Sequence, residues 1–514
     1  MSTVHATPPG PDFALGVPLS QLADGGMLLG HVGHEAVLLA RQADEVFAIG
    51  ATCTHYGGPL AEGVLDGDTI RCPWHHACFS LRTGEAVRAP ALSPVACWHV
   101  DRSATRIVVS RKTERDALAP TYPAPAARPN GVQRVVIVGA GAAGSAAAEM
   151  LRRCGFHGSV TIVDEEPDVP YDRPNLSKDF MSGKAPEEWI PLRPSGFYAE
   201  HNVELVRGRA ARLNVAAREL EVDGRAALPF DALLLSTGAE PVHLTIPGSE
   251  LPHVHYLRSL ADSRAIIAAA AHAKHVVVVG ASFIGLEVAA SLRIRELAVH
   301  VVGAEAVPLG RVLGPELGAF VRRLHEEHGV VFHLGRKPTR IEKGAVVLDD
   351  GTRLDATLVV VGVGVRPRLA LAEQAGLALD RGVTVNAFLE TSARGIYAAG
   401  DIARWPDPHS GEPVRVEHWV AAQRMGQTAA RNMLGAEERF EQVPFFWSAH
   451  YDVSINYVGH AETWDELRSD GSAAQHDVAV RFERQGKLLA LATIFRDEQS
   501  LQTEMAMEQE VCGQ

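Results

Sequence analysis

The sequence contains few cysteines, few aromatic residues and no long apolar run. Of its 514 residues 6 are cysteines, and aromatic side chains make up 6% of the chain. Six scattered cysteines are too few for the disulfide framework of a secreted domain, so cysteines that cluster are better explained as metal ligands. No apolar segment approaches the roughly 18 to 20 residues of a membrane span, and the first residues lack the basic and apolar regions of a signal peptide. We therefore expect a cytoplasmic protein that does not enter a membrane.

Positive charge is also scarce. The 49 Lys and Arg residues are outnumbered by 62 Asp and Glu residues, which gives a formal net charge of −13. Such a charge repels a phosphate backbone or an anionic lipid surface, and no basic patch offsets it. We expect neither nucleic acid nor a membrane among the partners. Hydrophobic residues make up 46% of the chain, so it has ample material for several globular cores.

The texture of the sequence changes along its length, which predicts a multidomain chain. Residues 14–110 alternate short β-type runs with turn residues, as in a small all-β domain. Residues 111–131 are rich in proline and predict an extended linker. From Arg134 strands alternate with helices, and the strand–glycine–helix pattern at Gly139 returns 141 residues later. That repeat predicts a parallel α/β body with two dinucleotide sites.

Two short segments of the β-rich region each pair a cysteine with a histidine. They are Cys53-Thr-His55 and Cys72-Pro-Trp-His75. Two thiolates on one iron and two imidazoles on the other are the ligands of a two-iron, two-sulfide cluster of raised potential. A zinc site and chance pairing are the alternatives, but zinc fingers pair cysteine with cysteine and histidine with histidine. We therefore predict that these four residues bind a [2Fe-2S] cluster, with the imidazoles toward solvent.

The segments CTHYGG and CPWHHACF resemble the Rieske ferredoxin family over residues 14–110. The resemblance implies a Rieske [2Fe-2S] domain of the ferredoxin type. Gly58 stands where respiratory Rieske proteins carry a loop cysteine, and His76 stands where glycine is common.

The first dinucleotide fingerprint is Gly139-Ala-Gly141-Ala-Ala-Gly144. Its first glycine makes the turn, the second admits the pyrophosphate and the third allows close packing of helix on strand. The acidic pair Asp164-Glu165 follows about 20 residues later at a strand end, where a carboxylate binds ribose hydroxyls. We predict Glu165 as a cofactor-binding residue.

The second fingerprint is Gly280-Ala-Ser282-Phe-Ile-Gly285, with serine in place of the middle glycine. Glu305 lies 20 residues beyond Gly285. Its carboxylate would accept a ribose 2′-hydroxyl and repel a 2′-phosphate, which predicts NADH rather than NADPH. Arg311 nearby leaves NADPH open as an alternative.

Two later motifs, LLLSTGAEP with Thr237-Gly238 and IYAAGDIA with Gly400-Asp401, resemble the FAD-dependent pyridine-nucleotide oxidoreductases of glutathione-reductase topology. The resemblance implies that Asp401 binds the ribityl chain and that the NAD domain is inserted into the FAD domain. The implied domains are a Rieske domain, a linker, a divided FAD domain, an NAD domain and a small α+β C-terminal domain, at 14–110, 111–131, 132–253 with 373–436, 254–372 and 437–514.

Disulfide reductases of that superfamily carry a Cys-x4-Cys pair after the first fingerprint, but here the region reads VPYDRPNLSKDF. With VPFFWSAHYD at 443–452, it resembles the oxygenase-coupled ferredoxin reductases and the apoptosis-inducing-factor-like proteins. The resemblance implies that Arg173 and Lys178 contact FAD, that Arg258 and Trp419 flank the cofactor, and that Glu287 lies where nicotinamide meets flavin. Glu287 and Trp419 are the predicted catalytic residues.

These motifs predict an NADH-dependent flavoprotein that passes electrons from NADH through FAD and a Rieske cluster to a ferredoxin, a cytochrome or an oxygenase component. A redox-sensing protein with little turnover, like the apoptosis-inducing-factor group, is the alternative. A Rieske oxygenase would need two histidines and a carboxylate on a mononuclear iron, and the HEEH run at 325–328 fits a solvent-facing helix instead. A homodimer and a monomer both remain open.

Overall fold

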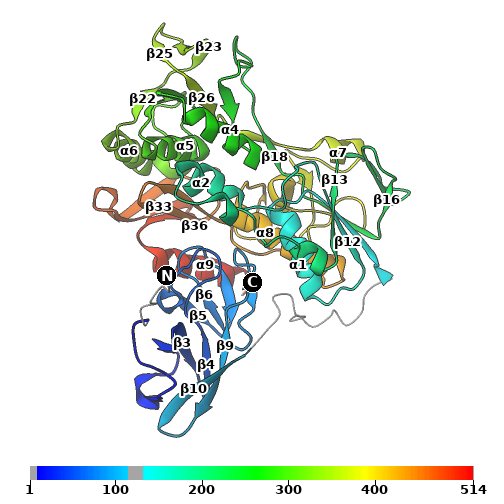
Figure 1. Ribbon diagram of the computed structural model, residues 1–514, viewed down its shortest axis with the longest axis vertical. Helices are drawn as coiled ribbons and strands as arrows, with labels where there is room; N and C mark the ends of the chain where they lie inside the picture. Colours follow the sequence, from blue (N-terminus) through cyan, green and yellow to red (C-terminus); the bar gives the residue numbers. More distant parts are fainter. Residues whose placement is uncertain (1–7, 114–130, 513–514) are drawn as a thin grey trace. The chain divides into compact units, whose positions relative to one another are not determined.

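The computed structural model describes residues 8–113 and 131–512, so most of the predicted linker at 111–131 lies outside the described residues. Two compact units form (Figure 1). The first contains residues 8–113, 149–156 and 497–512 of the described chain, and the second contains residues 131–148 and 157–496. An all-β first unit with one added helix and an α/β second unit confirm the predicted fold class.

The first unit is built from two antiparallel sheets. The larger sheet runs in the order β1 (Val17–Pro18), β10 (Arg106–Thr113), β9 (Cys97–Arg102), β4 (Glu45–Gly50), β3 (Glu35–Gln42) and β2 (Met27–Val32). The smaller sheet contains β5 (Val64–Asp66), β6 (Thr69–Arg71), β7 (Cys78–Ser80) and β8 (Ala86–Arg88). Alternate residues of β3 pack into two different cores, with Leu38 in one and Leu39 in the other, as the two-residue period of a strand requires. The last helix of the chain, α9 (Asp497–Cys512), also belongs to this unit.

The second unit contains two parallel five-stranded sheets of the same design. The first sheet runs in the order β13 (Val203–Arg207), β12 (Ser159–Asp164), β11 (Arg134–Val138), β17 (Ala232–Leu235) and β29 (Ile396–Ala398). The other runs in the order β19 (Val254–Tyr256), β26 (Leu358–Val361), β20 (His275–Val279), β21 (Ala298–Gly303) and β22 (Val331–Leu334). Strands buried on both faces read as unbroken apolar runs, and VVIV in β11 and VVVV in β20 have that form.

Helices of the second unit follow or cover these strands. Their bounds are α1 (Ala142–Arg153, whose last residues fall in the first unit), α2 (Asp179–Ser182), α3 (Phe197–Glu200), α4 (Leu260–Ala270), α5 (Phe283–Ile294), α6 (Gly310–Glu327), α7 (Ala370–Gln374) and α8 (Trp419–Met433). Smaller ladders join β14 (Ala210–Asn214), β15 (Glu219–Val222) and β16 (Leu228–Pro229); β23 (Pro338–Glu342), β24 (Ala345–Leu348) and β25 (Arg353–Asp355); β28 (Val383–Thr384), β30 (Ala403–Pro406) and β31 (Pro413–Val414); and β18 (Ala239–Pro241) and β27 (Val365–Pro367). No helix among the described residues is both long enough and apolar enough to cross a bilayer.

An antiparallel sheet completes the second unit. It runs in the order β32 (Phe445–His450), β33 (Val453–Gly459), β36 (Lys487–Ile494), β35 (Asp477–Arg484) and β34 (Glu466–Ser472). Its buried face shares one core with α5 and α6, where Ile455 and Phe482 join Leu292 and Leu317. Through β32 this sheet reaches α5, the helix that follows the second fingerprint.

Candidate functional site

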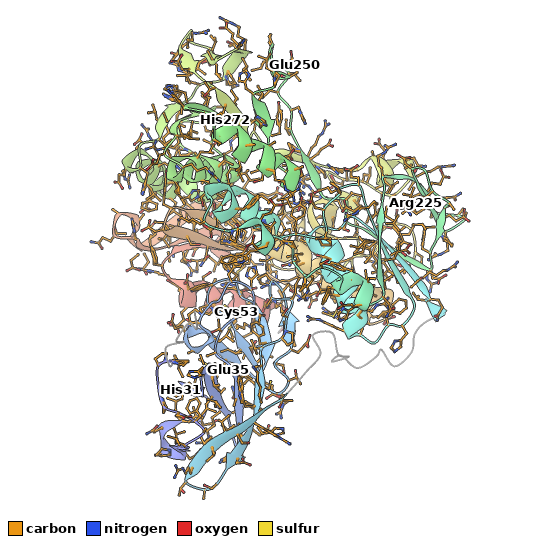
Figure 2. All side chains as sticks on the ribbon, in the orientation of Figure 1. His31, Glu35, Cys53, Arg225, Glu250 and His272 are labelled. Atoms are coloured by element: carbon orange, nitrogen blue, oxygen red, sulfur yellow. The ribbon has the colours of Figure 1, made fainter. Side chains whose placement is uncertain are left out.

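The two cysteine–histidine loops of the first unit have the same backbone geometry. The Cys53 N–H donates to the Gly58 carbonyl (2.8 Å), and the Gly57 N–H donates to the Cys53 carbonyl (3.1 Å). In the second loop the Cys72 N–H donates to the Ala77 carbonyl (2.8 Å), and the His76 N–H donates to the Cys72 carbonyl (3.1 Å). Each loop therefore presents its cysteine and histidine in an equivalent position. Figure 2 labels Cys53 on the first of them.

The four predicted cluster ligands come together as two pairs. The Cys53 thiol donates to Cys72, which raises the pKa of Cys53 and lowers that of Cys72. The Nδ1 atoms of His55 and His75 face each other at 3.2 Å. Both cysteines are buried, and both imidazoles are partly exposed. Two neighbouring thiols and two neighbouring imidazoles match the two ligand pairs of a two-iron cluster.

His76 occupies the turn position that Gly57 holds in the first loop. Its φ is +59° and that of Gly57 is +80°, so both residues adopt the left-handed conformation that favours glycine. A histidine is nevertheless accommodated, because its buried ring pairs through Nδ1 with the buried carboxylate of Glu504 on α9. Arg88 also donates to Glu504, through Nη2 (2.8 Å). Helix α9 thus supports the second cluster loop directly.

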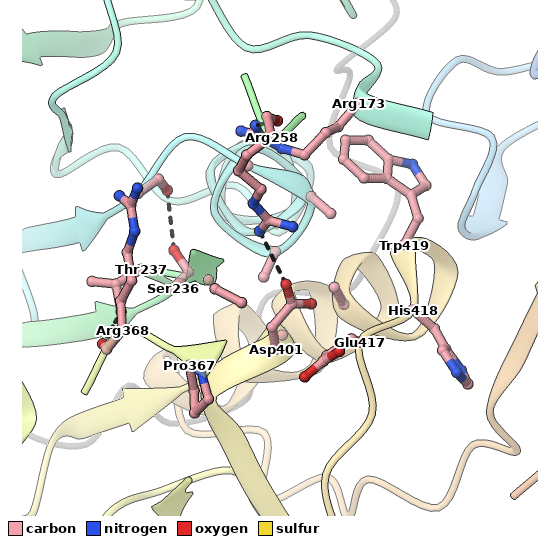
Figure 3. Close-up of a pocket in the computed structure, with 18 of the residues that line it drawn as sticks. Arg173, Ser236, Thr237, Arg258, Pro367, Arg368, Asp401, Glu417, His418 and Trp419 are labelled. Carbon is pink, nitrogen blue, oxygen red and sulfur yellow. Dashed lines mark hydrogen bonds and ion pairs between the residues drawn. The ribbon is translucent and has the colours of Figure 1, made fainter. Parts of the chain in front are cut away.

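A cavity of about 1100 Å³ lies in the second unit. The predicted site residues that line it are Gly139, Gly141, Glu165, Arg173, Lys178, Thr237, Gly238, Arg258, Glu287, Gly400, Asp401 and Trp419 (Figure 3 shows several of them). The cavity is therefore lined by residues at the carboxyl ends of β11, β12, β17 and β29 and by residues of α8. This is the carboxyl edge of a parallel sheet, where ligands bind in open α/β folds.

The glycines of the first fingerprint differ in the space that surrounds them. A Cβ at Gly139, where φ is +104°, would lie 2.3 Å from the Ser236 carbonyl oxygen, and one at Gly144 would lie 1.9 Å from that of Gly139. A Cβ at Gly141 would meet nothing within 4 Å, so the chain is open to the cavity there. Close packing at two positions and an open backbone at the third fit a bound pyrophosphate.

The two acidic residues at the end of β12, Asp164 and Glu165, make different contacts. Asp164 accepts from the backbone N–H of Ala140 and from that of Glu166 (2.7 Å), so it fixes the turn, and burial raises its pKa. Glu165 is exposed at the cavity and pairs with Arg368. The Asp164 carboxylate is therefore occupied by backbone N–H groups, whereas the Glu165 carboxylate faces the cavity, where it could bind a ribose hydroxyl.

Four charged residues lie next to one another in the lining of the cavity. Arg258 pairs with Asp401 (Nη2 to Oδ2, 3.0 Å), as Figure 3 shows, and burial lowers the pKa of Arg258. Arg173 donates to the Arg258 carbonyl and pairs with Glu166 (3.0 Å). The Asp401 carboxylate is thus held at the cavity surface by a cation, where a ribityl hydroxyl would find an acceptor.

Lys178 and Glu287 form a buried ion pair at the cavity wall. The Nζ–Oε2 distance is 2.8 Å, and the Ser177 hydroxyl donates to the same oxygen (2.5 Å). Glu287 is 4% exposed. A charge buried this deeply persists only with such partners, so the pair places a fixed cation and anion beside the cavity.

The second fingerprint lies at the end of β20 and the start of α5, where Phe283 and Ile284 line this cavity and Gly280, Ser282 and Gly285 do not. A Cβ at Gly280 would lie 2.2 Å from the Gly362 carbonyl oxygen, and one at Gly285 would lie 2.1 Å from that of Gly280. Ser282 is the N-cap of α5: its hydroxyl accepts from the Gly285 N–H (3.2 Å) and donates to the Gly362 carbonyl (2.7 Å). Serine therefore suits the middle position because it caps the helix. Glu305 pairs with Arg311 (2.7 Å), which is 83% exposed.

Sequence reasoning missed several residues at the cavity. Arg368, Glu417 and His418 also line it, and burial raises the pKa of Glu417 and lowers that of His418 to about 3.

The HEEH run was expected to face solvent, but His325 is fully buried. Val321 and Leu317 are buried one and two turns earlier on α6, and this helical spacing was a signal that His325 is buried as well.

Comparisons with known proteins agree with this geometry. The family model described as Pyridine nucleotide-disulphide oxidoreductase matches residues 133–426, and the Rieske [2Fe-2S] domain model matches residues 16–99. The chain is 31% identical to apoptosis-inducing factor 3 of Homo sapiens over 97% of this chain and 84% of that protein. It is 34% identical to putidaredoxin reductase CamA of Pseudomonas putida over 71% of this chain and 90% of that protein.

Solved structures give the same result. The reductase in the crystal structure of the covalent putidaredoxin reductase–putidaredoxin complex superposes with a TM-score of 0.71 at 32% identity, over 74% of this chain and 94% of that one. A ferredoxin reductase for the CYP199A2 system from Rhodopseudomonas palustris gives a TM-score of 0.68 at 31% identity, over 74% of this chain and 100% of that one. The chain therefore belongs to the pyridine nucleotide-disulphide oxidoreductase family, with a Rieske [2Fe-2S] domain preceding its α/β body.

Proposed function

We propose that the protein is an NADH-dependent flavoprotein oxidoreductase that delivers electrons one at a time to a protein acceptor, with its Rieske domain as a tethered electron carrier. One observation carries the proposal. The large cavity is lined by residues of the first glycine fingerprint, by Gly400 and Asp401 of the later motif, and by the Lys178–Glu287 pair. No cysteine is among its described lining residues. Disulfide reduction is thereby disfavoured, and electron transfer to an iron–sulfur centre is the chemistry that fits.

The cofactor-binding roles follow from the contacts. Gly139, Gly141 and Gly144 would hold the pyrophosphate of FAD, Glu165 its ribose and Asp401 its ribityl chain. Thr237, Gly238, Arg173 and Arg258 would hold the rest of the molecule. When bound, FAD accepts a hydride and releases single electrons. Gly280, Ser282, Gly285 and Glu305 would bind NADH.

The catalytic roles are those of Glu287 and Trp419. Lys178 and Glu287 would fix charge where nicotinamide meets flavin, and Trp419 at the start of α8 would cover the site and exclude water. Cys53, His55, Cys72 and His75 would bind the [2Fe-2S] cluster. We also propose the domain division expected from the sequence, with α9 as the part of the 437–514 segment that supports the Rieske domain.

The proposed acceptor is a ferredoxin, a cytochrome or an oxygenase component. Relatives named as ferredoxin–NAD(+) reductase components of dioxygenase systems support this choice. The proposed compartment is the cytoplasm, as the few and scattered cysteines of the sequence indicate. A homodimer stays a proposal that light scattering of the holoprotein would test.

The test is anaerobic reduction with NADH followed by turnover. Iron and sulfide content and the EPR spectrum of the reduced protein establish the cluster. We expect NADH to bleach the flavin and then the cluster absorbance, and to be oxidised repeatedly with ferricyanide, cytochrome c or a ferredoxin. Reduction that stops after one equivalent would favour the redox-sensing alternative, which the similarity to apoptosis-inducing factor 3 over 97% of this chain supports. A cluster that stays oxidised indefinitely beside a reduced flavin would contradict the tethered-carrier role.

A further inference from the structure

A chain of hydrogen bonds leaves the cavity at Glu287 and runs into the protein. The Ser448 hydroxyl donates to Glu287 Oε1 (2.7 Å) and lies 3.1 Å from His450 Nε2. His450 Nδ1 in turn lies 3.1 Å from His325 Nε2. Ser448, His450 and His325 are all fully or almost fully buried. Three polar side chains in an apolar core are costly unless each is paired, and here each is paired with the next.

The direction of every proton in this chain follows from one premise, that Glu287 is ionised by its pairing with Lys178. A carboxylate only accepts, so Ser448 must donate to it and accept from His450 Nε2–H. His450 Nδ1 then carries a lone pair and accepts from His325 Nε2–H. That assignment leaves a lone pair on His325 Nδ1, and this atom is buried with no hydrogen-bond partner in the structure. All donors therefore point toward Glu287, and the outermost acceptor is open.

Such a chain carries a proton in either direction. A proton placed on His325 Nδ1 lets each group pass its own proton inward, and the last one arrives on Glu287. Afterwards every group holds its proton on the outer side. In this reversed arrangement a proton on Glu287 can pass outward to His325 Nδ1 and leave, and the release returns the chain to the arrangement in which all donors point toward Glu287. The step needs neutral imidazoles, which both donate and accept. Burial and the Lys178 cation lower the pKa of His450 to about 3, and burial with His450 and His328 lowers that of His325.

The outer end lies near the surface. His325 is on the last turn of α6, and its ring centroid is 5.2 Å from that of Tyr451. The Tyr451 ring stacks on exposed His328 at 3.6 Å. Apart from Lys178 and Glu287, the charged or titratable neighbours of the chain are thus His328 and Tyr451, with Arg293 acting on Tyr451.

The proposed function requires a proton to leave this site, and the inference rests on that function. NADH gives up a hydride, which is two electrons and one proton, and becomes NAD⁺. One-electron iron–sulfur acceptors take the two electrons and no proton. One proton per NADH must therefore depart. We propose that Ser448, His450 and His325 form a proton relay between Glu287 at the flavin site and the surface beside His328.

The test separates proton movement from electron movement in the holoenzyme. Protein reduced with one equivalent of NADH is mixed with excess ferricyanide in weakly buffered solution, and a pH indicator is followed beside the flavin absorbance. In His450→Gln, His325→Gln and Ser448→Ala we expect proton release to slow about 100-fold, the lower end of what positioned proton transfer contributes, with a larger solvent isotope effect. The matched control is His333→Gln, which breaks a similar imidazole pair with His300 (3.0 Å); neither residue lines the cavity.

Two further measurements exclude a purely structural role. The relay variants should keep the FAD content and the flavin midpoint potential of the parent. In flavin-free protein, ¹⁵N-histidine spectra should show His450 and His325 neutral and protonated on Nε2, and Ser448→Ala should shift the His450 signals. Proton release within threefold of the parent in all three variants, or His450 signals that Ser448→Ala leaves unchanged, would overturn the relay. A parent enzyme that fails to oxidise NADH would instead overturn the proposed function.

Discussion

Removing the Glu504 carboxylate should destabilise the Rieske unit strongly. In Glu504→Gln the side chain keeps its size but loses the charge that pairs with Arg88 and His76. Glu504 and His76 are fully buried, and the Arg88 side chain is 11% exposed. Removing one partner of a buried ion pair costs about 3 to 5 kcal/mol. Arg88 retains Glu508, so the lower end is expected: about 3 kcal/mol, or roughly a 100-fold change in the folding equilibrium.

The assay follows the cluster, because only the Rieske unit carries it. Urea unfolding of the holoprotein, monitored by visible circular dichroism of the iron–sulfur centre, reports the stability of that unit, while flavin fluorescence reports the second unit. We expect the cluster transition of Glu504→Gln to move to lower urea with the flavin transition unchanged. The cluster should also be lost faster to an iron chelator, since His76 lies in the loop that holds Cys72 and His75.

The matched control is Glu510→Gln, which removes an exposed carboxylate from the same helix. Exposed surface substitutions change stability by about 0.5 kcal/mol or less. A Glu504→Gln effect as small as that of the control would refute the reasoning, because a buried network would then contribute nothing to the docking of α9. Equal shifts in both transitions would refute the assignment of α9 to the Rieske unit.

Three other substitutions test the cofactor sites. Gly144→Ala should abolish FAD binding, because its Cβ would lie 1.9 Å from the Gly139 carbonyl oxygen; the flavin content after desalting measures this. Cys72→Ser should remove the Rieske EPR signal and leave the flavin content unchanged, and a retained signal would exclude Cys72 as a ligand. Glu305→Ala should raise kcat/KM for NADPH relative to NADH by about tenfold, since the loss of one close like charge is worth about 1.4 kcal/mol; an unchanged ratio would show that Glu305 does not face the 2′ position.

The parts of this chain that sequence predicts well are those with strict local geometry. The two cysteine–histidine loops and the two glycine fingerprints each depend on a few neighbouring residues, so their spacing alone specifies them. The choice of Glu165 over Asp164 is also local, but it depends on which carboxylate the turn consumes. The contacts of Asp164 with the backbone of Ala140 and Glu166 support that choice, and no local sequence pattern gives them.

The parts that were missed depend on partners that are distant in the sequence. Glu504 pairs with Arg88, 416 residues earlier, and no local pattern connects them. Ser448 and His450 meet Glu287 only because β32 packs on α5. Contacts of this kind arise from the tertiary fold, so a single sequence offers no spacing rule for them.

The two missed features nevertheless share a signal. His325 follows the buried positions Leu317 and Val321 of α6 at helical spacing, and Glu504 lies between buried Leu501 and Met507 on α9. A polar residue in the middle of an apolar helical stripe must be buried with a partner or must disrupt the packing. The residue types of the HEEH run suggested a solvent-facing helix, because histidine and glutamate are polar. The 3.6-residue period of the helix places His325 on the same face as buried Leu317 and Val321, and therefore in the core. The same rule applies to both residues, because a buried polar group is tolerated where another polar group pairs with it. His325 pairs with His450, and Glu504 pairs with His76 of the second cluster loop.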